Sequence, residues 1–126
     1  MRLNQVTVPA LDLDRSIAFY QTLGLSLIVR SDHYARFEVG DGTDTFSLHL
    51  TDDAGGAANG PHIYFELDDL DARIADLRTK GIAFDSGPED KSWLWREAWL
   101  TDPAGVKLCL YFAGENRRFP PWRLND

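Results

Sequence analysis

The chain has 126 residues, of which 44% are apolar and 26% are charged, and its formal net charge is −7. This composition is typical of a folded globular protein, and the length suits one domain whose core needs no disulfide. The negative charge argues against a general affinity for nucleic acid or anionic membranes. The single cysteine, Cys109, and the absence of a long apolar run lead us to expect a cytoplasmic protein with a small-molecule partner.

The first half of the chain has the pattern of a strand, a helix and three further strands. Residues 3–8 alternate between apolar and polar as a strand does, and Pro9 is expected to end this strand. A helix should begin at Asp12 or Asp14, because a carboxylate can accept from the free backbone N–H groups there, and it should end at Gly24. The strands expected after it cover residues 25–30, 35–39 and 45–51.

The second half repeats this order after a shift of 57 positions. The shift brings Asp69 onto Asp12 and Gly81 onto Gly24, so the signals for the helix start and the helix end both recur. The elements expected here are a strand over residues 62–67, a helix over about 70–80, and strands near 83–84, 95–100 and 106–112. A βαβββ unit that occurs twice indicates an α+β fold built from two modules.

We expect these modules to form a single domain, joined by a linker of about residues 54–60 that has nothing to bury. Module one covers about residues 1–53, module two about 61–113, and a C-terminal tail about 114–126. The tail should be neither helix nor strand, and it carries Phe119 and Trp122 beside prolines and arginines. We expect it to lie across its own cavity rim or against the partner subunit of a homodimer.

Two short motifs carry a resemblance to a known protein family. They are the run Asp12-Leu13-Asp14-Arg15-Ser16-Ile17-Ala18-Phe19-Tyr20, followed by Leu23-Gly24-Leu25, and the hairpin Thr101-Asp102-Pro103-Ala104-Gly105-Val106. These motifs resemble the signatures of the vicinal oxygen chelate superfamily, which includes glyoxalase I, extradiol dioxygenases, fosfomycin-resistance proteins and bleomycin-binding proteins. The resemblance implies paired βαβββ modules, each forming half of an open barrel around a central cavity. It says less about the reaction, because such folds host unrelated activities.

The resemblance also implies a metal held by the first and the last strand of each module. Read onto this sequence, the four positions are Gln5, His49, His62 and Cys109. Two imidazoles, an amide and a thiolate can bind one divalent zinc, nickel or iron ion. Members that bind a metal usually have a carboxylate at one or both last-strand positions, which hold His49 and Cys109 here. The alternative is a vestigial site, with hydrogen-bonded histidines and Cys109 as a small buried apolar residue.

Aromatic side chains are expected to line the cavity. Tyr64, Trp95, Trp99 and Tyr111 fall on the interior-facing positions of their strands and are the candidate substrate-binding residues. The alternative is that several of the tryptophans only close the mouth of the barrel.

Two glutamates share this face and are candidate catalytic bases. Glu97 lies between Trp95 and Trp99, and Glu66 faces the same way as His62. A carboxylate in such a pocket can move a proton of the substrate. The structural alternative is an ion pair with an arginine of the same or a neighbouring strand, Arg96 or Arg36.

Two classes of function remain open. The first is a glyoxalase-like lyase or isomerase, in which a metal holds the vicinal oxygens of a small oxygenated substrate. The second is a metal-free module of the bleomycin-binding kind that sequesters a planar or cationic compound, which suits an acidic chain. An extradiol dioxygenase is less favoured, since its two histidines and one carboxylate would require other residues at Gln5 and Cys109.

Overall fold

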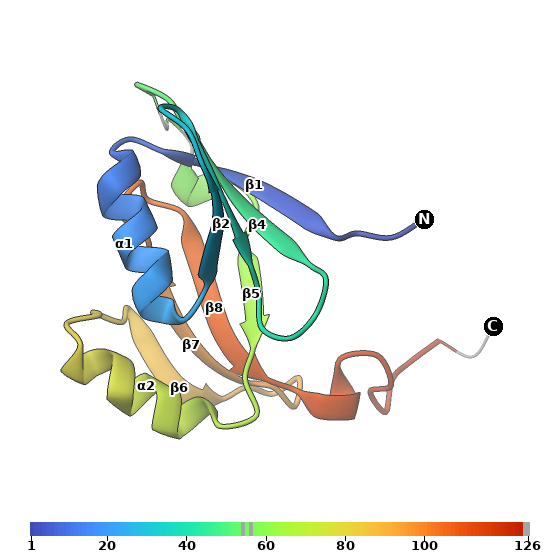
Figure 1. Cartoon of the computed structure of the whole chain (residues 1–126). Coiled ribbons are helices and arrows are strands. Elements are labelled where there is room, and N and C mark those ends of the chain that lie inside the picture. Colours follow the sequence, from blue (N-terminus) through green and yellow to red (C-terminus); the bar gives the residue numbers. More distant parts are fainter. Residues whose placement is uncertain (54, 56, 125–126) are drawn as a thin grey trace. The chain divides into compact units, whose positions relative to one another are not determined.

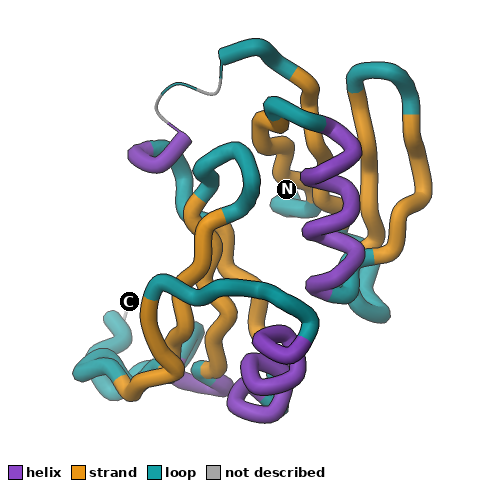
Figure 2. The backbone as a smooth tube through the Cα atoms, turned by 90° about the vertical axis from the view of Figure 1, so that its left-hand side faces the viewer, coloured by secondary structure: helices purple, strands orange, loops and turns teal. Residues whose placement is uncertain are grey.

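In the computed structural model, which describes residues 1–53, 55 and 57–124, the chain has an α+β fold with two four-stranded sheets and two helices (Figures 1 and 2). The first sheet, sheet one, has the strand order β1-β4-β3-β2, and the second, sheet two, has the order β5-β8-β7-β6. Neither sheet closes on itself. The paired βαβββ order expected from the repeat is therefore confirmed.

Module one consists of β1 (Gln5–Ala10), α1 (Leu13–Leu23), β2 (Ser26–Arg30), β3 (Tyr34–Glu38) and β4 (Thr45–Leu50). Module two consists of β5 (Ile63–Glu66), α2 (Leu70–Thr79), β6 (Ser86–Asp90), β7 (Arg96–Thr101) and β8 (Lys107–Phe112). The contacts divide the chain into two compact units, Met1–Pro61 with Thr101–Lys107, and His62–Leu100 with Leu108–Asp126. The tip of the β7–β8 hairpin thus belongs to unit one. No helix in the described ranges is long and apolar enough to cross a membrane.

In unit one, α1 packs its apolar stripe on sheet one. The carboxylate of Asp12 accepts from the backbone N–H of Arg15 at 3.1 Å, and Gly24 ends the helix with a φ of 111° that favours glycine. The buried ring of Tyr20 lies 4.6 Å from the ring of Phe46, measured between centroids. Burial of these apolar groups supplies most of the stability of such a layer.

Tyr20 also ties α1 to the hairpin tip of the same unit. Its hydroxyl donates to Asp102 at 2.6 Å, and Asp102 accepts from the backbone N–H groups of Ala104 and Val106 at 2.8 and 2.9 Å. Burial, together with the adjacent Asp102 carboxylate, raises the pKa of Tyr20, so its hydroxyl remains a neutral donor. The two motifs that carry the family resemblance therefore meet at this hydrogen bond.

Three sequence-based expectations about the elements were wrong. Pro9 does not end the first strand, because β1 lies at an edge of sheet one, where a residue without an N–H is tolerated. The strand expected at residues 83–84 is instead β6, an edge strand without the apolar alternation of a buried strand. The tail, expected to be neither helix nor strand, contains a short 3₁₀ turn, Gly114–Asn116.

Candidate small-molecule site

Four aromatic side chains gather on one face of sheet two, which we call the aromatic face; they are Tyr64, Trp95, Trp99 and Tyr111. The rings of Trp95 and Tyr111 are stacked, with centroids 4.7 Å apart and planes inclined by 18°. Tyr64 stands edge-on to the other three rings, at centroid distances of 5.6–5.9 Å. These are the offset and edge-to-face contacts that aromatic rings prefer. The structure thus brings together all four candidate substrate-binding residues.

The alternation of the strands explains this face. Cys109 and Tyr111 are buried beneath Trp95 and Trp99, so they form the floor of the aromatic face. The side chain of Tyr64 remains 44% exposed. The face therefore has a closed floor and an open rim, as a ligand-binding surface requires.

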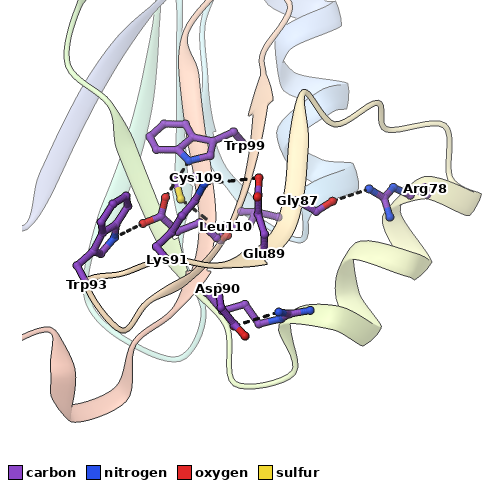
Figure 3. A network of polar contacts seen from close by, with 11 residues as sticks. Arg78, Gly87, Glu89, Asp90, Lys91, Trp93, Trp99, Cys109 and Leu110 are labelled. Atoms are coloured by element: carbon purple, nitrogen blue, oxygen red, sulfur yellow. Dashed lines mark hydrogen bonds and ion pairs between the residues drawn. The ribbon is translucent and has the colours of Figure 1, made fainter.

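Glu97 is held by two indoles and not by an arginine. Glu97 is only 3% exposed, and its two carboxylate oxygens accept from the ring N–H groups of Trp93 at 2.6 Å and of Trp99 at 2.9 Å. Figure 3 labels the two tryptophans. The expected ion pair with Arg96 or Arg36 is wrong. Arg96 binds carboxylates on other elements, and the described polar contact of Arg36 is with Tyr34 in unit one.

Sequence reasoning did not identify Trp93 as a member of this group. The segment before β7 that carries it shows no strand pattern, although a tryptophan four positions before a strand glutamate lies within hydrogen-bonding reach of it. Trp93 is 46% exposed while its indole N–H is engaged. Glu97 therefore fixes the orientation of one ring on the aromatic face and of a second ring at its border.

The aromatic face is electrostatically negative. Burial and the charge of Glu97 raise the pKa of the Cys109 thiol to about 12. Burial, with contributions from Cys109 and Glu97, raises the pKa of Tyr64, and burial with the Glu66 carboxylate raises the pKa of Tyr111. These three groups resist ionisation chiefly because they are buried, and the nearby Glu97 and Glu66 carboxylates add to the effect. A carboxylate beside the rings also favours a bound cation.

Glu66, the other candidate base, has a structural role in this arrangement. One oxygen of its carboxylate accepts from the backbone N–H groups of Ala113 and Gly114 at 2.8 and 2.9 Å. Gly114 has a φ of 58°, which favours glycine. Glu66 therefore anchors the start of the C-terminal tail beside the aromatic face.

A pocket of about 460 Å³ borders the aromatic face and has Trp95 as one of its walls. Leu94 and Phe112 contribute apolar surface to it, while Asp90 and Lys91 contribute charge. This volume lies in the range of small-molecule sites. The pocket and the aromatic face share Trp95.

The candidate metal ligands of unit one, Gln5 and His49, are far apart along their strands. In the parallel β1–β4 pair, Gln5 lies opposite Thr45 and His49 lies opposite Pro9, four positions farther along. Four strand residues span roughly 13 Å, too far for two side chains to share an ion directly. The amide oxygen of Gln5 instead accepts from the Thr45 hydroxyl at 2.8 Å.

The candidate ligands of unit two, His62 and Cys109, are also on different rungs. Cys109 lies opposite Tyr64, two residues beyond His62, and the ring of His62 is edge-on to Trp99 at 5.2 Å. The raised pKa of the Cys109 thiol opposes the thiolate form that a metal requires. In the described part of the chain, no three His, Cys, Asp or Glu side chains form a group that could bind a metal. The donors within each unit therefore do not fit a shared ion.

The register also shows why His49 and Cys109 are not equivalent positions. In sheet one, residue 45 lies opposite residue 5. In sheet two, Ile63 lies opposite Leu108, so residue 62, one position earlier, lies opposite residue 107. The last strands are thus related by a shift of 62 (107 − 45) and not by the 57 that relates the helices. The counterpart of Cys109 is Ser47, and the counterpart of His49 is Tyr111.

The corresponding face of sheet one, which we call the polar face, carries hydrogen-bonding side chains. The Nε of Arg36 donates to the Tyr34 hydroxyl at 2.8 Å, and this hydroxyl is 2.7 Å from the hydroxyl of Ser47. Desolvation acts to raise the pKa of Tyr34, but the hydrogen bonds from Ser47 and Arg36 outweigh it, and the pKa is lowered.

Comparisons with known proteins agree with this fold. The sequence model of the Glyoxalase/Bleomycin resistance protein/Dioxygenase superfamily matches residues 2–110. The bleomycin resistance determinant encoded on the transposon Tn5 is similar with a TM-score of 0.73 and 25% identity, over 89% of this chain and 98% of its own. A bleomycin-binding protein complexed with bleomycin has a TM-score of 0.72 and 25% identity, with the same coverage.

Lactoylglutathione lyase from Agrobacterium tumefaciens has a TM-score of 0.75 and 20% identity, over 94% of this chain and 97% of its own, a likeness of fold alone. No curated protein sequence matches the chain significantly.

Proposed function

Because the chain belongs to the glyoxalase, bleomycin resistance protein and dioxygenase superfamily, we propose that it binds a small organic molecule on the aromatic face of sheet two. The observation that carries this proposal is the joining of four aromatic rings above a buried carboxylate, that of Glu97. Stacking on such rings contributes about 0.5–1.5 kcal/mol per aromatic pair beyond the buried area.

A planar or cationic compound fits this face best. The carboxylate of Glu97 has two neutral indole donors as its described partners, so its charge is not cancelled by them. A cation held over the rings gains about 0.5–2 kcal/mol from their quadrupoles and further energy from this charge. The similarity to a protein complexed with bleomycin supports the same class of ligand.

A glyoxalase-like lyase that depends on a divalent metal fits the residues less well. Gln5 and His49 are separated by four rungs, and the Cys109 thiol is neutral at pH 7 because its pKa is about 12. Metal binding would require that proton to be released at a cost. We therefore propose a binding protein and not a metal-dependent enzyme.

The test is calorimetric titration with two flat probes that differ by one methyl group and by charge, the cation N-methylacridinium and its parent acridine, which is uncharged at pH 8. We expect saturable binding with a preference for the cation, and loss of binding in Trp99→Ala. Trp122→Ala is the matched control, because Trp122 is exposed and lies in the tail. Equal binding by Trp99→Ala and the unchanged protein would contradict the proposal.

We also propose that the protein is a cytoplasmic homodimer. Phe119 and Trp122 of the tail are 55% and 57% exposed, and β2 and β6 leave open edges on their sheets. The free thiol of Cys109 suits a reducing compartment. Deleting the chain from Arg117 onward should weaken the dimer. Light scattering that shows a monodisperse monomer of the full chain, at tens of micromolar, would contradict it.

A further inference from the structure

Arg36, in the middle of β3, is a partly enclosed cation without a carboxylate partner. It projects from the polar face, where its described partners are Tyr34, through a hydrogen bond of 2.8 Å, and the same tyrosine's ring, 5.3 Å from the guanidinium carbon. No ion pair to Arg36 occurs in the described part of the chain. Glu38, two residues along the same strand, does not pair with it either.

Exposed arginines such as Arg15 and Arg78 have no ion pair in the described part of the chain either, so the informative comparison is with Arg96, which is partly buried like Arg36. Arg30, which is more exposed, binds Asp14 at 2.6 Å, and Arg96 binds Asp71 and Asp90 at 2.9 and 3.0 Å. The chain has 20 acidic residues and a net charge of −7, so carboxylates are abundant. Keeping a partly buried guanidinium without an anion forgoes the favourable charge-assisted hydrogen bonds that a carboxylate would supply. An arrangement of this kind is expected where an external anion completes the site.

The geometry around Arg36 leaves the two terminal nitrogens of its guanidinium available to bind an anion. Its Nε–H is committed to Tyr34, which fixes the plane of the guanidinium, while the end-on pair of Nη1 and Nη2 has no described partner. Tyr34 is itself held by the buried hydroxyl of Ser47 at 2.7 Å. A guanidinium held in this way offers two parallel N–H donors, the fork that binds planar or tetrahedral oxyanions.

We propose that Arg36, positioned by Tyr34 and Ser47, is a receptor for an oxyanion group, the carboxylate or phosphate of a small molecule. The site lies on the polar face of sheet one, and none of these three residues belongs to the aromatic face of sheet two. Gln5 and Thr45, which bond to each other at 2.8 Å, lie on the same face, and so does Glu38, opposite Thr45. The acidic chain repels anions in general, so binding here depends on local contact and not on long-range attraction.

The experiment follows the side-chain Nε–Hε signal of Arg36 by NMR in the full chain. Inorganic phosphate and acetate are titrated separately, with sodium chloride added to hold the ionic strength constant. We expect a saturable shift of this signal with at least one of the two anions. The anion that binds more tightly identifies the group as phosphate or carboxylate.

Three variants sharpen the test. Arg36→Gln should weaken anion binding, followed through the Tyr34 amide signal, by roughly tenfold or more, and Arg36→Lys should keep the charge but lose much of the affinity with the fork. Arg15→Gln is the control, because it removes one exposed positive charge elsewhere in unit one. A shift that does not saturate, or binding that Arg36→Gln leaves unchanged, overturns the proposal. Binding of N-methylacridinium to sheet two should be unaffected in every variant, so the two proposals fail separately.

Discussion

The two sheets come from one repeated pattern, yet their candidate binding faces have opposite chemistry. The polar face of sheet one carries Arg36, Tyr34 and Ser47 in a chain of hydrogen bonds. The aromatic face of sheet two carries stacked rings above the buried carboxylate of Glu97. One face therefore offers a positive charge with hydroxyl groups, and the other offers a negative field with π surfaces.

The difference shows which part of a repeat is constrained by folding. Both modules keep the aspartate before the helix, the glycine after it and the apolar residues that the helix covers. These positions determine the backbone, so the free energy of folding preserves their character. The opposite faces carry different side chains in the two modules, although Cys109 and Tyr111 of the aromatic face are themselves buried. Equivalence in the repeat therefore does not imply equivalence of function.

The largest expected effect concerns the reactivity of Cys109. A pKa of about 12 in place of the usual 9.0 lowers the thiolate fraction at pH 8 about a thousandfold, because 12 − 9 = 3 powers of ten. Iodoacetamide should therefore label the native protein at least a thousand times more slowly than the urea-unfolded chain, as followed by mass spectrometry. Labelling of the native thiol at a free-thiol rate would mean that the aromatic face is neither closed nor negative.

The second prediction contrasts the two faces directly. Trp95→Ala should lower the free energy of unfolding by about 3 kcal/mol, because it removes a stacked ring and leaves a cavity above Tyr111. Tyr34→Phe on the polar face should cost only about 1 kcal/mol, the usual net value of a hydrogen bond. Urea unfolding measures both values. Equal costs would show that the aromatic face is not the better packed of the two.

The third prediction concerns the helices, which differ at one equivalent position. Under the shift of 57, Tyr20 of α1 corresponds to Leu77 of α2, and only the tyrosine bonds to the hairpin tip, through Asp102. Tyr20→Phe should cost about 2 kcal/mol, because the buried carboxylate of Asp102 loses a donor. Leu77→Met, which nearly conserves volume, is the matched control and should cost less. Thermal and urea unfolding check both variants.

The fold was readable from the sequence because its signals are local. Asp12 and Gly24 mark the ends of α1, and the recurrence of such signals after 57 residues predicts the second module. The edge strand β6 was misplaced because an edge strand buries little and needs no apolar alternation. The prediction that Pro9 ends the first strand failed for a related reason, because β1 is also an edge strand, where a missing N–H costs little.

The candidate site was only partly readable. The alternation of side chains along each strand predicted that Tyr64, Trp95, Trp99 and Tyr111 share one face, because this alternation is a property of the strand itself. The register between strands is not local, so the sequence could not show that Gln5 lies opposite Thr45 and four rungs from His49. The bonds of Glu97 to two indoles likewise depend on the path of the segment before β7.

The fourth prediction tests the negative charge of the aromatic face. Glu97→Gln keeps the size and removes the charge, although its amide has one acceptor oxygen, so one of the two indole bonds is also lost. The affinity for N-methylacridinium should fall roughly tenfold, about 1.4 kcal/mol, and that for acridine should fall by less. Glu89→Gln is the control, because Glu89 is exposed and its charge is paired with Lys91 at 3.5 Å. Parallel losses for both probes would mean that Glu97 acts through the orientation of Trp93 and Trp99 and not through its charge.

The smallest expected effect is that of a chelator, because the proposed binding uses no metal. Treatment with EDTA should leave the affinity for N-methylacridinium unchanged within about twofold, less than 0.5 kcal/mol. The physical reason is that Gln5 and His49 lie four rungs apart and Cys109 is held as a neutral thiol.

His62→Ala should then cost roughly 1 kcal/mol of stability, through the loss of the ring contact with Trp99, and should not change the metal content. Elemental analysis of protein purified without added ions is the decisive measurement. A stoichiometric metal that EDTA removes and that His62→Ala abolishes would show that the two modules act together as one metal centre, and would favour the glyoxalase-like lyase over the binding protein.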